Sequence, residues 1–233
     1  MSADIVAALT RISTATITNA LLKKGLRNVW LRGARSLHAG QPRVAGRAFT
    51  MRFVPQREDI SNHQALASPR STRVAIEDLK AGDIAVVGAC GITDAGIFGD
   101  ILTARLKVRG AAGLVTDGSL RDLAGLRKVD LPVWCAGVAA PASIGQLAFV
   151  DWQQPIGCGG VAIFPGDFIV ADDDGAVVVP PAYAEEVVES GKDAEAVEDW
   201  ILERVLEGRK LPGLYPPNEA AMAEYNAEKS KSR

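Results

Sequence analysis

The sequence contains little cysteine and little histidine. Its 233 residues include three cysteines, Cys90, Cys135 and Cys158, and two histidines, His38 and His63. An odd number of widely spaced cysteines argues against a disulfide framework and a sulfur-ligated zinc, and favours a reducing compartment. The two histidines, both in predicted connections, argue against a histidine-rich zinc or iron site.

Long apolar runs and an excess of one charge are also missing. No stretch approaches twenty uninterrupted apolar residues, and the start of the chain, MSADIVAALTRIST, has no long apolar core. We therefore expect a cytoplasmic protein that is not bound to a membrane. The 26 basic and 28 acidic residues are interspersed, so we expect no binding to nucleic acid.

The first half of the chain alternates between strand and helix patterns. Two helices are expected at the start, the second capped by Ser13 or Thr14 and ended by Gly25. The expected elements that follow are a strand over 43–55, a helix or turn and then a strand at 84–87, a helix over 100–110, a strand in 112–118, a helix over 119–129 and a strand in 131–137. This βαβαβ order predicts a parallel sheet with right-handed crossovers.

From residue 144 onward the pattern changes to short apolar runs that are separated by Gly, Pro and Asp, as in antiparallel hairpins. The acidic stretch Asp172 to Gly175 reads better as a hairpin turn than as a metal cluster. A long charged helix follows, with a break expected near Gly191. We therefore predict an α/β domain over 1–190 and a C-terminal helical extension and tail over 191–233.

Two acids and an arginine lie where parallel strands are expected to end. Asp100 begins a predicted helix, and Arg121 and Asp122 follow a predicted strand. Local structure offers one explanation, because acids favour the first turn of a helix and Ser119 and Asp122 have capping-box spacing. It leaves Arg121 unexplained, since the helix dipole disfavours a cation there. Ligands of parallel α/β sheets bind at this edge, which is the competing explanation.

These residue types suit the chemistry of a 2-oxo acid. A metal held by one or two aspartates, water and substrate oxygen would be a hard cation, Mg²⁺ or Mn²⁺. Arg121 can hold a carboxylate or a developing enolate oxygen with two donors. The backbone N–H groups of residues 99–102 can bind a carboxylate. Together they would stabilise the enolate of a 2-oxo acid.

The spacing D-x20-R-D of Asp100, Arg121 and Asp122, with the surrounding GDIL, VTDGSLRD, LPVWCAG and PGDFIVADDDGAVVVP, resembles the RraA-like proteins. This family includes class II 4-hydroxy-4-methyl-2-oxoglutarate/4-carboxy-4-hydroxy-2-oxoadipate aldolases. The resemblance extends from about residue 15 to about residue 210. It implies a swivelling α/β/β sandwich with a parallel βαβ core and antiparallel C-terminal strands, assembled as a trimer or a dimer of trimers with active sites between subunits.

The resemblance also implies a role for each site residue. Asp122 would ligate the divalent ion, Arg121 would bind the pyruvyl portion, and Asp100 would order a metal-bound water. The backbone of Gly99, Asp100, Ile101 and Leu102 would hold the substrate carboxylate. The family's aldolases add a glutamate from the C-terminal helix of a neighbouring subunit, for which we favour Glu198. The acids of the predicted helix that could take this place are Glu195, Glu198, Asp199 and Glu203.

Three functions are compatible with these residues and with the resemblance. The resemblance implies a metal-dependent aldolase that cleaves a 4-hydroxy-2-oxo acid to pyruvate and a carbonyl compound, with oxaloacetate decarboxylation as a side activity. Other family members are protein regulators that bind and inhibit RNase E. A Schiff-base aldolase would need a desolvated lysine, such as Lys107 or Lys128. The carbonyl half of a substrate would meet variable loops, such as residues 52–71.

Overall fold

The longest strand, β2 (Val44–Pro55), connects the two halves of the sheet. In the computed structural model, which describes residues 2–231, β2 pairs in parallel with β3 (Ile84–Gly88). It also pairs antiparallel with β11 (Phe168–Asp172) near its start and with β8 (Leu147–Trp152) near its end. A single strand thus joins the expected parallel core to the expected antiparallel C-terminal strands, and both predictions are confirmed.

Beyond β3 the parallel part continues through β4 (Gly113–Thr116) and β6 (Val133–Cys135), giving the order β1-β6-β4-β3-β2-β11-β12. The remaining strands are β1 (Arg35–Ser36), β5 (Ser119–Leu120), β7 (Gly137–Val138), β9 (Ile156–Cys158), β10 (Val161–Ile163) and β12 (Gly175–Val179). The α-helices are α1 (Ser2–Leu9), α2 (Thr14–Lys23), α3 (Thr72–Asp78), α4 (Asp100–Val108), α5 (Leu123–Leu126), α6 (Ala184–Leu206) and α7 (Glu219–Lys231).

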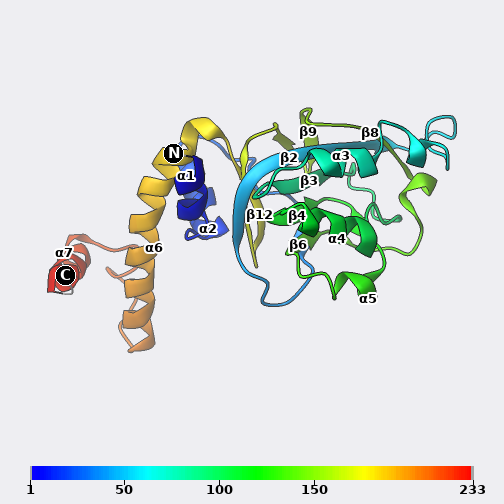
Figure 1. Cartoon of the computed structure of the whole chain (residues 1–233). Coiled ribbons are helices and arrows are strands. Elements are labelled where there is room, and N and C mark those ends of the chain that lie inside the picture. Colours follow the sequence, from blue (N-terminus) through cyan, green and yellow to red (C-terminus); the bar gives the residue numbers. More distant parts are fainter. Residues whose placement is uncertain (1, 232–233) are drawn as a thin grey trace.

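The central strands are buried on both faces, and their side chains alternate between two cores. Ile84 and Val86 of β3 belong to a core shared with α1, α2 and the β9–β12 strands. Ala85 and Val87 belong to a second core beneath α3, α4 and α5. Figure 1 shows these helices on one side of the sheet. Helices α3, α4 and α5 thus cover one face of the parallel strands, and the C-terminal strands with α1 and α2 cover the other. With both faces covered, the loops at the strand ends are where ligands bind in such sheets.

The helix expected over 119–129 is much shorter than predicted. Residues Ser119–Leu120 form β5, which pairs in parallel with β7, and the helix α5 covers only Leu123–Leu126. The pairing of β5 holds Ser119 extended and buried, so the capping box considered as one explanation of Ser119 and Asp122 does not form. Arg121 consequently lies in the connection between strand and helix, and not in a first helical turn.

The predicted break near Gly191 is also wrong, because α6 runs continuously from Ala184 to Leu206. Gly191 permits close packing on α1 and α2, since a Cβ at this position would lie 2.8 Å from Cδ1 of Ile12. The expected boundary between residues 190 and 191 therefore falls inside a helix. Beyond α6, the chain folds back through α7, which lies far from the sheet (Figure 1).

Several local predictions are confirmed. Ser13 caps α2 by accepting a hydrogen bond from the backbone N–H of Thr16, and Gly25 adopts a positive φ after the helix. The Asp172 to Gly175 stretch is the turn between β11 and β12. Within residues 2–231, no helix combines the length and the apolar content that crossing a membrane requires.

Asp172 attaches the N-terminal helices to the sheet. Its carboxylate accepts hydrogen bonds from the backbone N–H and the hydroxyl of Thr14, at 2.8 and 2.6 Å, and lies 3.3 Å from Nε of Arg43. Asp172→Ala would leave these buried donors without an acceptor. Since a hydrogen bond to a charged group contributes about 1.5–3 kcal/mol, we expect the free energy of unfolding in urea to fall by roughly 3 kcal/mol. Asp173→Ala, in the exposed turn, is the control, and an equal effect of both substitutions would contradict this role.

Candidate functional site

A pocket of about 350 Å³ lies where α4 begins and where the chain passes from β5 to α5. All of the residues predicted for the site of one chain line this pocket. They are Gly99, Asp100, Ile101, Leu102, Arg121 and Asp122. The fold thus brings together two segments that are twenty residues apart in the sequence.

Arg121 is held at the pocket by a backbone hydrogen bond and by an ion pair with Asp122. Its backbone N–H donates to the carbonyl of Phe98 at 2.9 Å, which fixes the residue beside the start of α4. Its side-chain Nε is buried and has no hydrogen-bond acceptor among the described residues. Nε lies 3.2 Å from Oδ2 of Asp122, close enough for an ion pair but without the geometry of a hydrogen bond. Since Nε is buried while 37% of the side chain is exposed, other atoms of Arg121 line the pocket.

Asp122 has an unusual backbone conformation. Its φ of 59° and ψ of 44° are left-handed, a region that aspartate and asparagine tolerate better than most residues. It stands at the N-cap position of α5 but makes no capping hydrogen bond. Its carboxylate instead points to Gly99, where any Cβ would overlap Oδ2. The conformation thus directs the carboxylate toward α4 and away from its own helix.

The side chain of Asp100 is held between the start of α4 and Gly125 of α5. Its Oδ1 accepts a hydrogen bond from the backbone N–H of Ile101 at 2.8 Å. Its side chain packs on Gly125 of α5, where an added Cβ would lie 2.7 Å from Cβ and Cγ of Asp100. Gly96 provides similar room for Arg121, whose Cβ would lie 2.6 Å from an added Cβ. Three glycines therefore let the two acids and the arginine come together.

The backbone amides at the start of α4 are only partly free. The N–H of Ile101 is engaged by the side chain of Asp100, so it is not available to a carboxylate. In the part of the chain that the structure describes, no acceptor contacts the N–H groups of Gly99, Asp100 and Leu102. These groups lie at the positive end of the α4 dipole and can bind an anion.

Two carboxylates at the pocket are the candidate ligands for a divalent cation. No group of three or more His, Cys, Asp or Glu residues within the described chain could hold a metal. Asp122 offers a half-exposed carboxylate whose Oδ1 makes no hydrogen bond among the described residues, and Asp100 offers a second carboxylate nearby. A site with so few protein ligands suits Mg²⁺ or Mn²⁺, which retain water and substrate oxygens.

The pocket is also lined by polar residues outside the Asp100 and Arg121 segments. Thr72 and Arg73 of α3 and Ser143 line it, together with His63. His63 lies in the 52–71 segment, which was expected to meet the carbonyl half of a substrate. Because these residues come from three separate segments, no spacing in the sequence could indicate that they meet.

The lysines and cysteines do not take part in this pocket. Lys107 pairs with Asp130, and Lys128 lines a different pocket, so neither is placed for a Schiff base at this site. Burial raises the pKa of Cys135 to about 11, and burial followed by the negative charge of Asp117 raises the pKa of Cys90. Both thiols therefore remain protonated near neutral pH.

The acids of α6 lie far from the pocket of their own chain, as Figure 1 shows for α6 relative to α4 and α5. Glu195 already has a structural contact, because it accepts a hydrogen bond from the backbone N–H of Ser13 at 2.9 Å. Glu198, Asp199 and Glu203 make no ion pair or side-chain hydrogen bond within residues 2–231. Glu198 therefore does not line the pocket of its own chain.

Relatives of known sequence and structure resemble most of the chain. A protein of Halalkalibacterium halodurans named "Putative 4-hydroxy-4-methyl-2-oxoglutarate aldolase" is 36% identical over 155 residues, which cover 62% of this chain and 73% of that protein. Protein DlpA of Legionella pneumophila is 27% identical over 87% of this chain, which spans only 32% of its length.

Among solved structures, Streptomyces coelicolor RraAS2, described as an unusual member of the RNase ES inhibitor RraA protein family, is 38% identical with a TM-score of 0.76. The match covers 84% of this chain and 94% of RraAS2. An uncharacterised Pseudomonas syringae protein is 27% identical with a TM-score of 0.78, over 92% and 98% of the two chains. The fold is thus that of the RraA proteins. Residues 14–178 match the family described as "RraA-like: Aldolase/RraA", and the chain belongs to the RraA-like family.

Proposed function

We propose that this protein is a divalent-metal-dependent aldolase that cleaves a 4-hydroxy-2-oxo acid to pyruvate and a carbonyl compound. The observation that carries the proposal is the convergence of Arg121, Asp122, Asp100 and free N–H groups of α4 on one pocket. These groups can hold a 2-oxo acid and stabilise the negative charge that develops on its oxygen. The relationship to the protein named as an aldolase supports the same reaction class.

Each residue has a role in this proposal. The N–H groups of Gly99, Asp100 and Leu102 bind the substrate carboxylate, and the guanidinium of Arg121, which lines the pocket, donates to the 2-oxo oxygen. Asp122 holds the cation, Mg²⁺ or Mn²⁺, which supplies Lewis-acid stabilisation of the same oxygen when bound. Glu198 of a neighbouring copy, in a trimer or dimer of trimers, stays a prediction.

The reaction needs one proton removed and one proton added. Asp100 orders a water molecule that takes the proton from the C4 hydroxyl. The C3–C4 bond then breaks, the hydroxyl carbon leaves as a carbonyl, and the bonding electrons form the pyruvate enolate. Protonation of C3 gives pyruvate. Because decarboxylation of oxaloacetate gives the same enolate, we expect that activity as well.

A second function is regulation of an RNA-degrading enzyme. The observation that favours it is the similarity to RraAS2, whose family is described by RNase ES inhibition. Such a regulator needs a binding surface and no pocket chemistry. The convergence of Arg121, Asp122 and Asp100 on one pocket favours the enzyme.

Chelation tests the metal. With EDTA, we expect release of pyruvate from 4-hydroxy-2-oxo acids and from oxaloacetate, measured with a lactate dehydrogenase coupling, to be lost. Addition of excess Mg²⁺ or Mn²⁺ should restore it, because the paired carboxylates prefer hard cations. Full activity in chelator, or trapping of substrate on a lysine by borohydride, would rule out this mechanism.

Substitution of Arg121 separates the enzyme from the regulator. Arg121→Ala should lower kcat for aldol cleavage and for decarboxylation by about 10² to 10³, the usual effect of losing a preorganised donor to an oxyanion. Arg121→Lys keeps the charge but loses the planar pair of donors, so it should also be impaired. Binding to an RNase E-type partner should not change. If Arg121→Ala leaves both reactions intact, the arginine has only a structural role.

The glycine beneath Asp100 gives a third test. Gly125→Ala adds a Cβ that would collide with the side chain of Asp100 and displace its carboxylate, while the backbone of α5 tolerates alanine. A displacement of about 1 Å can cost up to roughly 10² in rate. Gly157→Ala is the matched control, because nothing lies within 4 Å of its added Cβ. Equal kcat values for the two variants would show that the position of Asp100 does not matter.

A further inference from the structure

A second pocket, of about 750 Å³, lies at the same edge of the sheet as the site at α4. Its walls include the connections that follow β3 and β4, the last part of β2 and the turn of the β9–β10 hairpin. We call it the hairpin pocket. Its volume falls within the range of about 300–1,000 Å³ that is usual for small-molecule sites in proteins.

The hairpin pocket is separate from the site at α4, because no described residue lines both. The connection between β3 and α4 passes from one pocket to the other. Three of residues 90–93 line the hairpin pocket, and three of residues 96–99 line the site at α4. This connection is held in place where the N–H of Gly96 donates to the carbonyl of Pro141 at 2.9 Å. A ligand of the hairpin pocket is therefore distinct from the substrate of the site at α4.

Arg32 contributes a positive charge to the hairpin pocket. Its Nη1 donates to the carbonyl of Gly159 at 3.4 Å, and its Nη2 donates to Oδ1 of Asn28 at 3.2 Å. Both acceptors are uncharged, and among residues 2–231 Arg32 makes no ion pair. Gly160 leaves room for this arrangement, since an added Cβ would lie 2.6 Å from Nη1. The fold thus holds a guanidinium at the pocket wall with its charge uncompensated.

The other two charged side chains of the lining, Arg52 and Asp117, are already engaged. Arg52 donates from Nε and Nη2 to the two carboxylate oxygens of Asp151. Asp117 is only 7% exposed, and its carboxylate accepts hydrogen bonds from three backbone N–H groups. Hydrogen bonds of this kind stabilise the negative charge within the protein. Arg32 is therefore the charged group of the lining that remains for a ligand.

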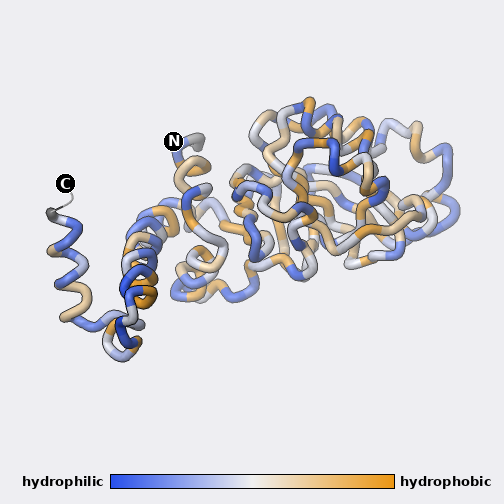
Figure 2. Tube along the Cα trace, turned by 90° about the horizontal axis from the view of Figure 1, so that it is seen from below, coloured by the Kyte–Doolittle hydropathy of each residue, from blue (hydrophilic) through white to orange (hydrophobic). Residues whose placement is uncertain are grey.

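Uncharged donors surround the same pocket. In the part of the chain that the structure describes, the backbone N–H groups of Cys90, Thr93 and Gly160 meet no acceptor, and the hydroxyl of Thr93 makes no hydrogen bond. Figure 2 shows apolar and hydrophilic residues interspersed along the part of the chain that contains the sheet, so hydropathy alone does not define a ligand for this pocket. The free donors do define one, because together with Arg32 they match the oxygens of an anion.

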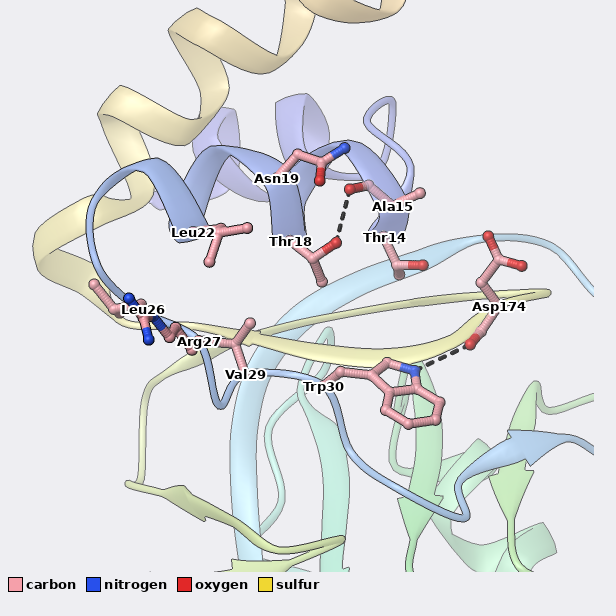
Figure 3. Close-up of a pocket in the computed structure, with 10 residues that line it drawn as sticks. All are labelled: Thr14, Ala15, Thr18, Asn19, Leu22, Leu26, Arg27, Val29, Trp30 and Asp174. Atoms are coloured by element: carbon pink, nitrogen blue, oxygen red, sulfur yellow. Dashed lines mark hydrogen bonds between the residues drawn. The ribbon is translucent and has the colours of Figure 1, made fainter.

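The hollow between α2 and the β11–β12 turn provides a contrast. It measures about 360 Å³ and contains Trp30, whose Nε1 donates to the carbonyl of Asp174 at 3.1 Å (Figure 3). Arg27 and Asp174 lie at opposite ends of this hollow in Figure 3. Opposite charges in one hollow do not select the sign of a ligand, whereas the planar guanidinium of Arg32 favours two oxygens of one oxyanion.

We propose that the hairpin pocket binds a small organic anion, whose carboxylate or phosphate group is held by Arg32. Nη1 and Nη2 each carry two hydrogens, and the chain uses one of each, so one remains on each nitrogen for two oxygens of the ligand. The N–H groups of Thr93 and Gly160 donate to the same oxyanion. The inference does not depend on the proposed aldolase activity.

Protection of Cys90 from alkylation tests the binding directly, because this exposed thiol lines the pocket. The full-length protein is treated with iodoacetamide in inorganic phosphate, in succinate, or in sodium chloride of the same ionic strength, and labelling is followed by mass spectrometry. A mildly alkaline pH is used, because burial and then the charge of Asp117 raise the pKa of Cys90. We expect slower labelling in phosphate or succinate, saturating with concentration, and the more effective anion distinguishes a phosphate from a carboxylate group. Equal rates in all three salts would overturn the proposal.

Three variants locate the bound anion. Arg32→Gln removes the charge but keeps an amide donor, so the anion concentration for half protection of Cys90 should rise by about tenfold or more. Arg35→Gln changes an exposed arginine outside the pocket, and Arg121→Ala changes the site at α4, so both should protect Cys90 as the wild type does. Circular dichroism should show all three variants folded. Unchanged protection in Arg32→Gln, or an equal loss in Arg121→Ala, would place the anion elsewhere and refute the proposal.

Discussion

Burial of the parallel strands on both faces is the constraint on which the rest of the structure depends. Residues 84–88 of β3 are fully enclosed, with alternate side chains in the two cores. Such strands cannot carry charged side chains toward a ligand without a large desolvation cost. Polar chemistry is therefore confined to the loops at their carboxyl ends, where α4 and α5 also begin.

Two aspartates at this edge show how the same residue type serves two purposes. Asp117 is buried and accepts hydrogen bonds from the backbone N–H groups of Ala89, Gly91 and Gly159, at 2.7, 3.1 and 3.1 Å. It holds three loops together and has little capacity left for a ligand. Asp122, five residues later, makes no hydrogen bond through its side chain among the described residues and keeps a left-handed backbone. Conformational strain of this kind is commonly found at functional sites.

The C-terminal segment, residues 196–231, buries its apolar residues in a small core of its own. The rest of the chain buries its apolar side chains in the two cores on either side of the sheet, whereas this segment buries only the side of α6 that faces α7. The segment is too small to cover the other face of α6 as well, so Leu202 and Leu206 remain exposed. A helix with one buried and one exposed apolar face gains stability from a further contact, because apolar area removed from water is favourable.

The sequence by itself determined the order of the elements and the chemistry that the chain offers. The run Ile84 to Val87, the glycines that end α2 and α4, and the spacing of Asp100 and Arg121 are local or periodic signals, and they predicted the parallel core and the principal residues of the site. The fold and the family membership agree with that prediction. The function of these residues stays a proposal.

Only the tertiary structure decided what surrounds those residues. Local propensity suggested a helix from Ser119, but pairing of β5 with β7 holds Ser119 extended and places Arg121 ahead of α5. The roles of Gly96, Gly99 and Gly125 depend on which distant side chain packs on each glycine. The continuity of α6 depends on the contact between Gly191 and Ile12. Each of these features is set by contacts between segments far apart in the chain, and such contacts leave no periodic signal in the sequence.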